Sequence, residues 1–261
     1  MPEPGAGAAR GTIVLIHGAW QGSWAFAAWQ PLLAAAGWHS VAVDLPGNGI
    51  NPEPLAADGL AAYTDHVVGV LRAQGRPCVV LGHSGGGQVA AQVAEAAPEC
   101  VSALVFLVGM MLPSGMRFVD LLAHCRRLYP EADFAGITPF LKASADGRFT
   151  QVPPAAAREI FLHDCPPEAA AAAALRLTPQ PEWGRAVVPA LTPQRYGSVP
   201  RIYVEALADR SIGIALQREM QALSPGARRI TLPCGHVPQL ACPGPLTDAL
   251  CAVLEEIQAD V

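Results

Sequence analysis

The sequence predicts a single α/β domain built on a six-stranded, mainly parallel sheet that is flanked by helices and carries an inserted helical cap. Short apolar, β-rich runs alternate with helical patterns along most of the chain, which is typical of a parallel sheet covered on both faces. The length of 261 residues, of which 51% are hydrophobic, suits one domain with a sizeable core. A long central stretch breaks the alternation, which indicates an insertion.

Six apolar runs have the length and composition of strands, and four helical patterns lie between or after them. Helix-ending residues support the boundaries, because Gly75 follows the first helical pattern and Pro98 follows the second. The predicted strands are residues 12–17, 40–44, 78–81, 102–108, 201–205 and 229–232. The predicted helices are residues 60–72, 86–96, 214–222 and 245–257.

The central stretch, residues 113–185, is predicted to be a helical cap, and residues 1–112 and 186–261 the core. Two helix-like pieces, at 118–127 and 167–177, are separated by proline-rich turns. The second contains a run of alanines at 169–174, and alanine is the best helix former. Long connections without structure of their own are uncommon inside compact domains, so we expect an organised insertion.

Composition and charge exclude several classes of function. The formal charge of -5 and the absence of runs of Lys or Arg argue against nucleic acid and anionic membranes as partners. No secretory signal is recognisable at the N-terminus, and the longest apolar run is too short to cross a bilayer, so a cytoplasmic protein is predicted. The seven cysteines are odd in number and form no CxxC pair, which favours reduced thiols over a metal site.

A candidate nucleophile lies at the end of the third predicted strand. The segment Gly82-His83-Ser84-Gly85-Gly86 has the G-x-S-x-G pattern, preceded by an apolar run and followed by a helical pattern. This strand-turn-helix context presents a serine hydroxyl on a sharp turn, where flanking side chains would collide with the neighbouring strand and helix. Ser84 is therefore the predicted nucleophile.

A serine hydroxyl needs a base to take its proton and an acid to orient that base. His236 follows the last predicted strand, and Asp209 follows the strand before it. The chain order Ser84, Asp209, His236 is the order used in the α/β-hydrolase fold. Glu205 and Asp44 remain alternatives for the acid.

An oxyanion site is predicted beside this triad. The turn His17-Gly18-Ala19-Trp20 follows the first strand at the same edge of the sheet as Ser84. The N–H groups of Ala19 and Gly85 could converge there on one oxygen, and Gly85 opens a helix.

These segments resemble the plant methylesterase and hydroxynitrile lyase branch of the α/β-hydrolases. The resemblance spans nearly the whole chain, is specific in the core and is faint in the cap. It implies a six-stranded core, a helical cap over the active site, no cofactor, and often a homodimer. The matching segments are residues 14–24, 31–37, 41–45, 82–86, 196–199 and the loop around 236.

Three positions depart from the pattern of this branch. Trp20 fills a position that is commonly small or cysteine, and Gly235 replaces an acidic residue. The lyases of the branch resemble one another in having a lysine directly after the catalytic histidine, where this chain has Val237. Because cyanide departure needs a nearby cation, an esterase is expected rather than a hydroxynitrile lyase.

The predicted activity is cleavage of a carboxylic ester or lactone of a small, mainly apolar molecule by a serine hydrolase without metal or cofactor. Two alternatives stay open: a non-hydrolytic enzyme that uses the same triad, and a ligand receptor on the same fold. A mostly apolar pocket is expected, although each of its residues could equally serve cap-to-core packing. The predicted pocket residues are Trp20, Met110, Met111, Phe118 and Leu121.

Overall fold

The computed structural model describes residues 10–51 and 59–259 of the chain. Its central sheet has six strands, all parallel, in the order β2-β1-β3-β4-β8-β9. The predicted parallel sheet is therefore confirmed, while the parts of the predicted core at 1–9, 52–58 and 260–261 lie outside the described residues. The strands are β1 (Gly11–Ile16), β2 (Trp38–Val43), β3 (Cys78–His83), β4 (Val101–Leu107), β8 (Arg201–Ala206) and β9 (Ala227–Leu232).

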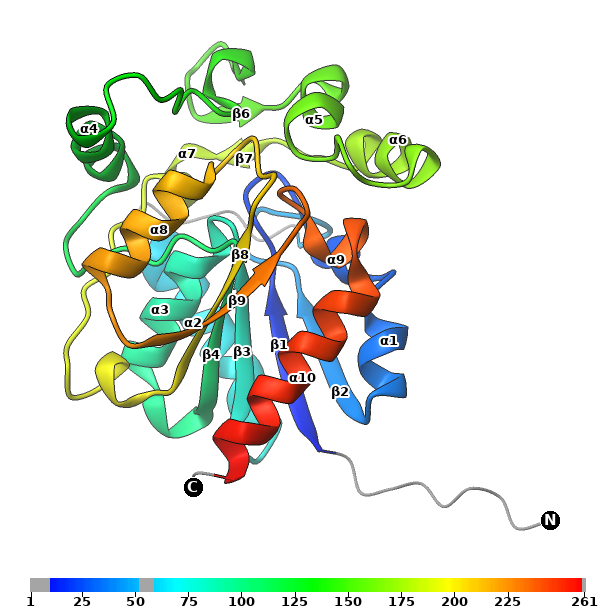
Figure 1. The fold of residues 1–261 in the computed structure, drawn as a ribbon, viewed down its shortest axis with the longest axis vertical. Coiled ribbons are helices and arrows are strands. Elements are labelled where there is room, and N and C mark those ends of the chain that lie inside the picture. The colour runs from blue at the N-terminus through cyan, green and yellow to red at the C-terminus, as the bar shows by residue number, and fades with distance from the viewer. Residues whose placement is uncertain (1–9, 52–58, 260–261) are drawn as a thin grey trace.

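Helices cover both faces of this sheet. In Figure 1, α2 and α3, which pack against each other, lie behind the sheet, and α10 lies in front of it with α1 beside it. The predicted strands and core helices are all present, with ends that differ by at most two residues. The core helices are α1 (Gln30–Ala35), α2 (Gly59–Ala73), α3 (Gly86–Ala96), α8 (Ile214–Leu223), α9 (Pro238–Ala241) and α10 (Pro243–Ala259), with 3-10 turns at Ser23–Phe26, Pro98–Cys100, Thr138–Phe140 and Tyr196–Ser198.

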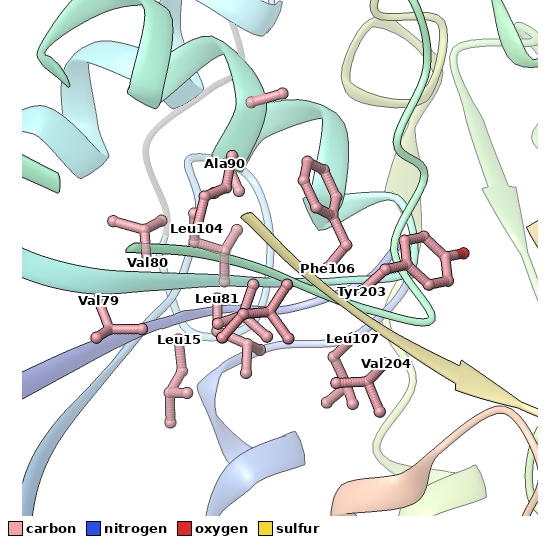
Figure 2. Close-up of a cluster of buried hydrophobic side chains, with 14 of the residues drawn as sticks. Leu15, Val79, Val80, Leu81, Ala90, Leu104, Phe106, Leu107, Tyr203 and Val204 are labelled. Atoms are coloured by element: carbon pink, nitrogen blue, oxygen red, sulfur yellow. The ribbon is translucent and has the colours of Figure 1, made fainter. Parts of the chain in front are cut away.

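Buried side chains project from both faces of the central strands. Figure 2 shows Val80 and Phe106 on one side, near Ala90 of α3, and Val79 and Leu107 on the other. All of them are buried, as expected for strands with apolar residues at successive positions. This core fixes the ends of the strands from which the candidate site is built.

The insertion between β4 and β8 lies across the edge of the sheet at which the strands end (Figure 1). Both predicted cap helices are present, and the cap also contains a small antiparallel sheet of order β5-β6-β7 that the sequence did not indicate. Strands of two or three residues are too short to give a period in the sequence. The cap elements are α4 (Phe118–Leu128), β5 (Lys142–Ala143), β6 (Phe149–Gln151), α5 (Pro154–Ile160), α6 (Pro167–Leu175), β7 (Gln180–Pro181) and α7 (Glu182–Arg185).

The cap has its own buried apolar cluster, separate from the main core. Trp20 and Val237, which belong to loops of the core, pack into this cluster with cap residues such as Phe161 and Leu162. The cap is thus packed onto the two core loops that carry the predicted oxyanion turn and the predicted base. No helix in the described ranges is both long and apolar enough to span a bilayer.

Candidate active site

Ser84 lies on a sharp turn between β3 and α3, with a left-handed backbone (φ = 51°). Its N–H donates to the Leu107 carbonyl at 3.2 Å, and its carbonyl accepts from the Met110 N–H at 2.8 Å. Glycines are needed on both sides: a Cβ on Gly82 would lie 2.5 Å from the Gly86 carbonyl oxygen, and one on Gly86 would lie 2.5 Å from the His17 carbonyl oxygen. The structure thus stabilises a backbone conformation that is unfavourable for serine.

Ser84, His236 and Asp209 form a chain of hydrogen bonds. The Ser84 Oγ lies 3.1 Å from Nε2 of His236, and Nδ1 of His236 donates to Oδ2 of Asp209 at 2.8 Å. The side chains of His236 and Asp209 are almost completely buried. The three predicted residues therefore meet in a geometry that lets a base take the proton of the serine hydroxyl.

Asp209 is held by several donors besides His236. Its Oδ1 accepts from the backbone N–H groups of Ser211 at 2.6 Å and Ile212 at 3.0 Å. The buried Gln217 side chain donates to the Ile212 carbonyl at 2.7 Å and accepts from the Ala206 N–H at 3.0 Å, which braces the same loop. These bonds orient the carboxylate toward His236.

The two alternative acids have other partners. The carboxylate of Glu205 accepts from Arg218, Gln221 and Thr231. That of Asp44 accepts from the N–H and the hydroxyl of Ser23. Neither carboxylate contacts His236.

The ring of His236 lies between two further rings. Phe161 of the cap is stacked on it with centroids 5.1 Å apart, and the His83 ring is 5.2 Å away. Nε2–H of His83 donates to the carbonyl oxygen of His236 at 2.8 Å. Burial, and to a smaller extent the neighbouring His236, lowers the pKa of His83 to about 3, so His83 adds no positive charge beside the base at neutral pH.

The predicted oxyanion donors lie near each other. A Cβ on Gly85 would be 3.8 Å from the Ala19 nitrogen, and both residues line the same cavity as Ser84. His17 fixes the Ala19 turn, because its Nδ1–H donates to the Gly18 carbonyl at 2.8 Å and its Nε2 accepts from the Leu45 N–H at 3.2 Å. Burial lowers the pKa of His17, which keeps it in this neutral tautomer.

A cavity of about 410 Å³ lies above Ser84, between the core and the cap. Trp20, Met110 and Phe118 line it, as predicted. The expectation for Met111 and Leu121 is wrong, because both are fully buried in the main core and do not line the cavity. Apolar side chains that the sequence did not indicate complete the lining: Leu45, Val89, Val119, Leu122, Phe134, Ile137, Phe161, Val187 and Ile212.

Trp20 joins the predicted oxyanion turn to the cap. Its backbone is left-handed (φ = 62°), and its indole Nε1–H donates to the carbonyl and hydroxyl of Thr150, each at 3.2 Å. Its backbone N–H donates to Gln180 at 3.0 Å, and its ring is stacked on Phe161 with centroids 6.1 Å apart. Trp20 thus has a structural role in addition to lining the cavity.

Polar side chains also line the cavity, among them Gln88, Tyr63, Glu182 and Arg185. Gln88 is buried one helical turn after Ser84. Among residues 10–51 and 59–259, its Nε2 donates only to the Met110 sulfur and its Oε1 has no hydrogen-bond partner. The Tyr63 hydroxyl accepts from Asn48 and Gln180. Glu182 and Arg185 form an ion pair at 3.0 Å on the cap side.

The residue that follows His236 does not provide a cation beside Ser84. Val237 is buried in the cap cluster. Lys142 lies on the exposed strand β5 and does not line the cavity. Within residues 10–51 and 59–259, no three His, Cys, Asp or Glu side chains form a group that could hold a metal ion.

The fold and this site define an α/β hydrolase, and comparison with known proteins agrees. Residues 13–249 match the alpha/beta hydrolase family, to which this chain therefore belongs. The chain is 32% identical to a pyrethroid hydrolase of Sphingobium wenxiniae, over 91% of this chain and 85% of that protein. It is 28% identical to the esterase PIR7B of Oryza sativa subsp. japonica, over 82% and 84% of the two chains.

Solved structures show the same fold. A pyrethroid hydrolase from Sphingobium faniae superimposes with a TM-score of 0.78 at 24% identity, covering 95% of this chain and 98% of that one. Tomato methylketone synthase I with bound 2-tridecanone gives a TM-score of 0.78 at 21% identity, covering 95% and 98%. Pyrethroid hydrolase structures at 25% identity include one variant with a serine replaced by alanine and one with a histidine replaced by alanine.

Proposed function

We propose that this protein hydrolyses a carboxylic ester through an acyl-enzyme formed on Ser84. The observation that carries the proposal is the hydrogen-bonded chain from Ser84 through His236 to Asp209 at the floor of a largely apolar cavity. The esterase and hydrolase names of the relatives, and the solved serine and histidine variants, support it.

In the first half-reaction, Oγ of Ser84 attacks the ester carbonyl carbon while its proton passes to Nε2 of His236. The N–H groups of Ala19 and Gly85 make no other hydrogen bond in the described structure and are free to bind the oxyanion. Asp209 stabilises the imidazolium, which then gives its proton to the departing alkoxide. In the second half-reaction, water attacks the acyl carbon while its proton passes to His236; the bond to Ser84 Oγ then breaks, Oγ takes that proton back, and the acid is released.

The substrate is inferred to be a mainly apolar ester or lactone. The cavity has the volume of a site for a small organic molecule, and aromatic and aliphatic side chains make up most of its lining. The similarity to a pyrethroid hydrolase favours an ester with a bulky apolar group over one with a charged group. The two arginines that line the cavity are both ion-paired, Arg117 with Asp120 and Arg185 with Glu182, which disfavours a charged substrate group.

The test is turnover of an aryl acetate and a bulkier aryl ester by the wild type and by Ser84→Ala. We expect Ser84→Ala to lose turnover of both esters and labelling by a serine-directed phosphonate, with an unchanged melting temperature. Ser102→Ala, an exposed serine at the far end of β4, is the matched control and should behave as wild type. Retained turnover in folded Ser84→Ala would contradict the assignment.

Mandelonitrile separates ester hydrolysis from cyanohydrin cleavage on the same site. Because Val237 is apolar and buried, the residue after His236 supplies no cation to offset the charge of departing cyanide. We therefore expect Ser84-dependent ester cleavage to be faster than Ser84-dependent cyanide release, and the reverse order would favour a lyase.

A further inference from the structure

The cap segment between α5 and α6, residues 161–164, touches both core loops that carry the proposed base and acid. Nε2–H of His163 donates to the carbonyl oxygen of Ala208, the residue before Asp209, at 2.9 Å. The Asp164 carboxylate accepts from the N–H of Gly235, the residue before His236, at 2.5 Å.

The ring of Phe161, from the same segment, is stacked on the ring of His236 itself at 5.1 Å and on Trp20 at 6.1 Å. The two core loops are also joined to each other, because the Ala208 N–H donates to the Cys234 carbonyl at 2.9 Å. One short cap segment therefore contacts the base, the loop of the base and the loop of the acid.

The fit around Gly235 leaves little space. A Cβ at that position would lie 2.5 Å from Oδ1 of Asp164 and 2.9 Å from Nε2 of His163, so a side chain there would push the segment away. The backbone of Gly235 is not left-handed, so an alanine is excluded by this contact and not by backbone conformation.

We propose that Phe161, His163 and Asp164 are positioning residues that hold the ring of His236 in line with Ser84. Asp164 fixes the backbone on which His236 is carried, and Phe161 covers the ring. The inference rests on the proposed function, in which Nε2 of His236 must stay within hydrogen-bond reach of Oγ of Ser84 in each half-reaction. Misplacement of a reacting group by about 1 Å costs on the order of 100-fold in rate.

If the cap served substrate binding alone, replacing its residues would change the kinetic constants differently. Loss of a binding contact raises KM and spares kcat, whereas loss of alignment lowers kcat and leaves KM nearly unchanged. Asp164 does not line the cavity, so its replacement removes no wall of the substrate site. Its exposed position also makes a folded variant attainable.

The experiment is a double-mutant cycle of Asp164→Ala and Gly235→Ala, with Asp164→Asn beside it. Asp146→Ala is the matched control, because within the described part of the chain this cap aspartate bonds only in its own turn, to Ser144 and Arg148. We expect each single variant to lower kcat by about 10- to 100-fold with KM within about threefold of wild type. The double variant should be scarcely slower than the slower single variant, since both changes break the same contact.

Asp164→Asn keeps an oxygen for the Gly235 N–H and should retain most of kcat, and Asp146→Ala should match wild type. A second readout does not depend on turnover. We expect wild type to show a low-field proton resonance from His236 Nδ1–H, and this resonance should broaden or vanish in Asp164→Ala. Unchanged kcat and resonance in folded Asp164→Ala, or fully additive effects in the cycle, would overturn the proposal. If wild type shows no Ser84-dependent turnover, the proposed function fails, and the resonance alone still decides this inference.

Discussion

Replacement of Asp209 by asparagine tests how the acid controls the base. The orientation of an asparagine here is dictated by its neighbours, because the N–H groups of Ser211 and Ile212 both donate to Oδ1. The amide oxygen of Asn would stay with these two donors, which leaves its NH₂ group facing Nδ1 of His236.

An NH₂ group facing Nδ1 selects the tautomer of His236 whose proton is on Nε2. That proton points at Oγ of Ser84, so the ring cannot take the serine proton. We expect kcat at neutral pH to fall by about 10⁴-fold, equivalent to about 5 kcal/mol of transition-state stabilisation. Because the main-chain hydrogen bonds are retained, the free energy of unfolding should change little.

The assay is steady-state hydrolysis of an activated aryl ester from pH 6 to 9, with thermal unfolding of each variant. Asp44→Asn and Glu205→Gln are the controls, since both remove a carboxylate near the ends of strands without touching His236. The reasoning is refuted if folded Asp209→Asn keeps more than about a tenth of the wild-type kcat. It is also refuted if a control variant has a lower kcat than Asp209→Asn.

Three further predictions concern pH, packing and buried polarity. His83 has a pKa of about 3 in the folded protein against 6.5 when exposed, so the unfolded protein takes up its proton first as the pH falls. The free energy of unfolding should therefore be highest above pH 6.5 and decrease toward pH 3, by up to about 1.4 kcal/mol per pH unit. Leu121→Ala should destabilise the fold by about 2–5 kcal/mol, whereas Leu122→Ala should mainly change substrate preference. Gln88→Met should raise the melting temperature by about 2–4 °C, because it removes a buried acceptor without a partner.

Each of these has a direct measurement. The free energy of unfolding, measured with denaturant between pH 7.5 and 5, should depend less steeply on pH in His83→Gln than in wild type. An equal slope in both proteins would contradict the pKa assigned to His83. For the leucine pair, equal losses of melting temperature would show that the cavity wall is misplaced. A lower melting temperature in Gln88→Met would mean that this amide has a stabilising partner, such as a bound water.

The sheet and the meeting of Ser84, Asp209 and His236 were predictable because their signals are local. The central strands β1, β3 and β4 are nearly continuous apolar runs. The Ser84 turn is marked by glycines at positions where a Cβ would collide with the backbone. Asp209 and His236 follow strands directly, and in a parallel sheet the ends of neighbouring strands meet at one edge.

The cavity lining was only partly predictable, because it depends on which side of a segment faces the cap. Met110 and Met111 follow β4 in irregular backbone, where no period indicates the direction of a side chain, and only Met110 lines the cavity. On α4, Leu121 was predicted to line the cavity, but it faces the core, and its neighbour Leu122 lines the cavity. That choice depends on how α4 packs against α8, a contact between segments about 95 residues apart, as in the His124–Glu219 pair.

Gly235 was recognisable in the sequence as an unusual residue before His236, but the sequence did not reveal its structural role. Its partner Asp164 is 71 residues away, and nothing in the local pattern of the cap identifies that aspartate. With Trp20 bonded to β6 and β7 and Phe161 stacked on His236, the cap is bonded to the oxyanion turn and to the base at once. In the proposed mechanism, a change in the cap that moved this segment would therefore also move the base and the oxyanion turn.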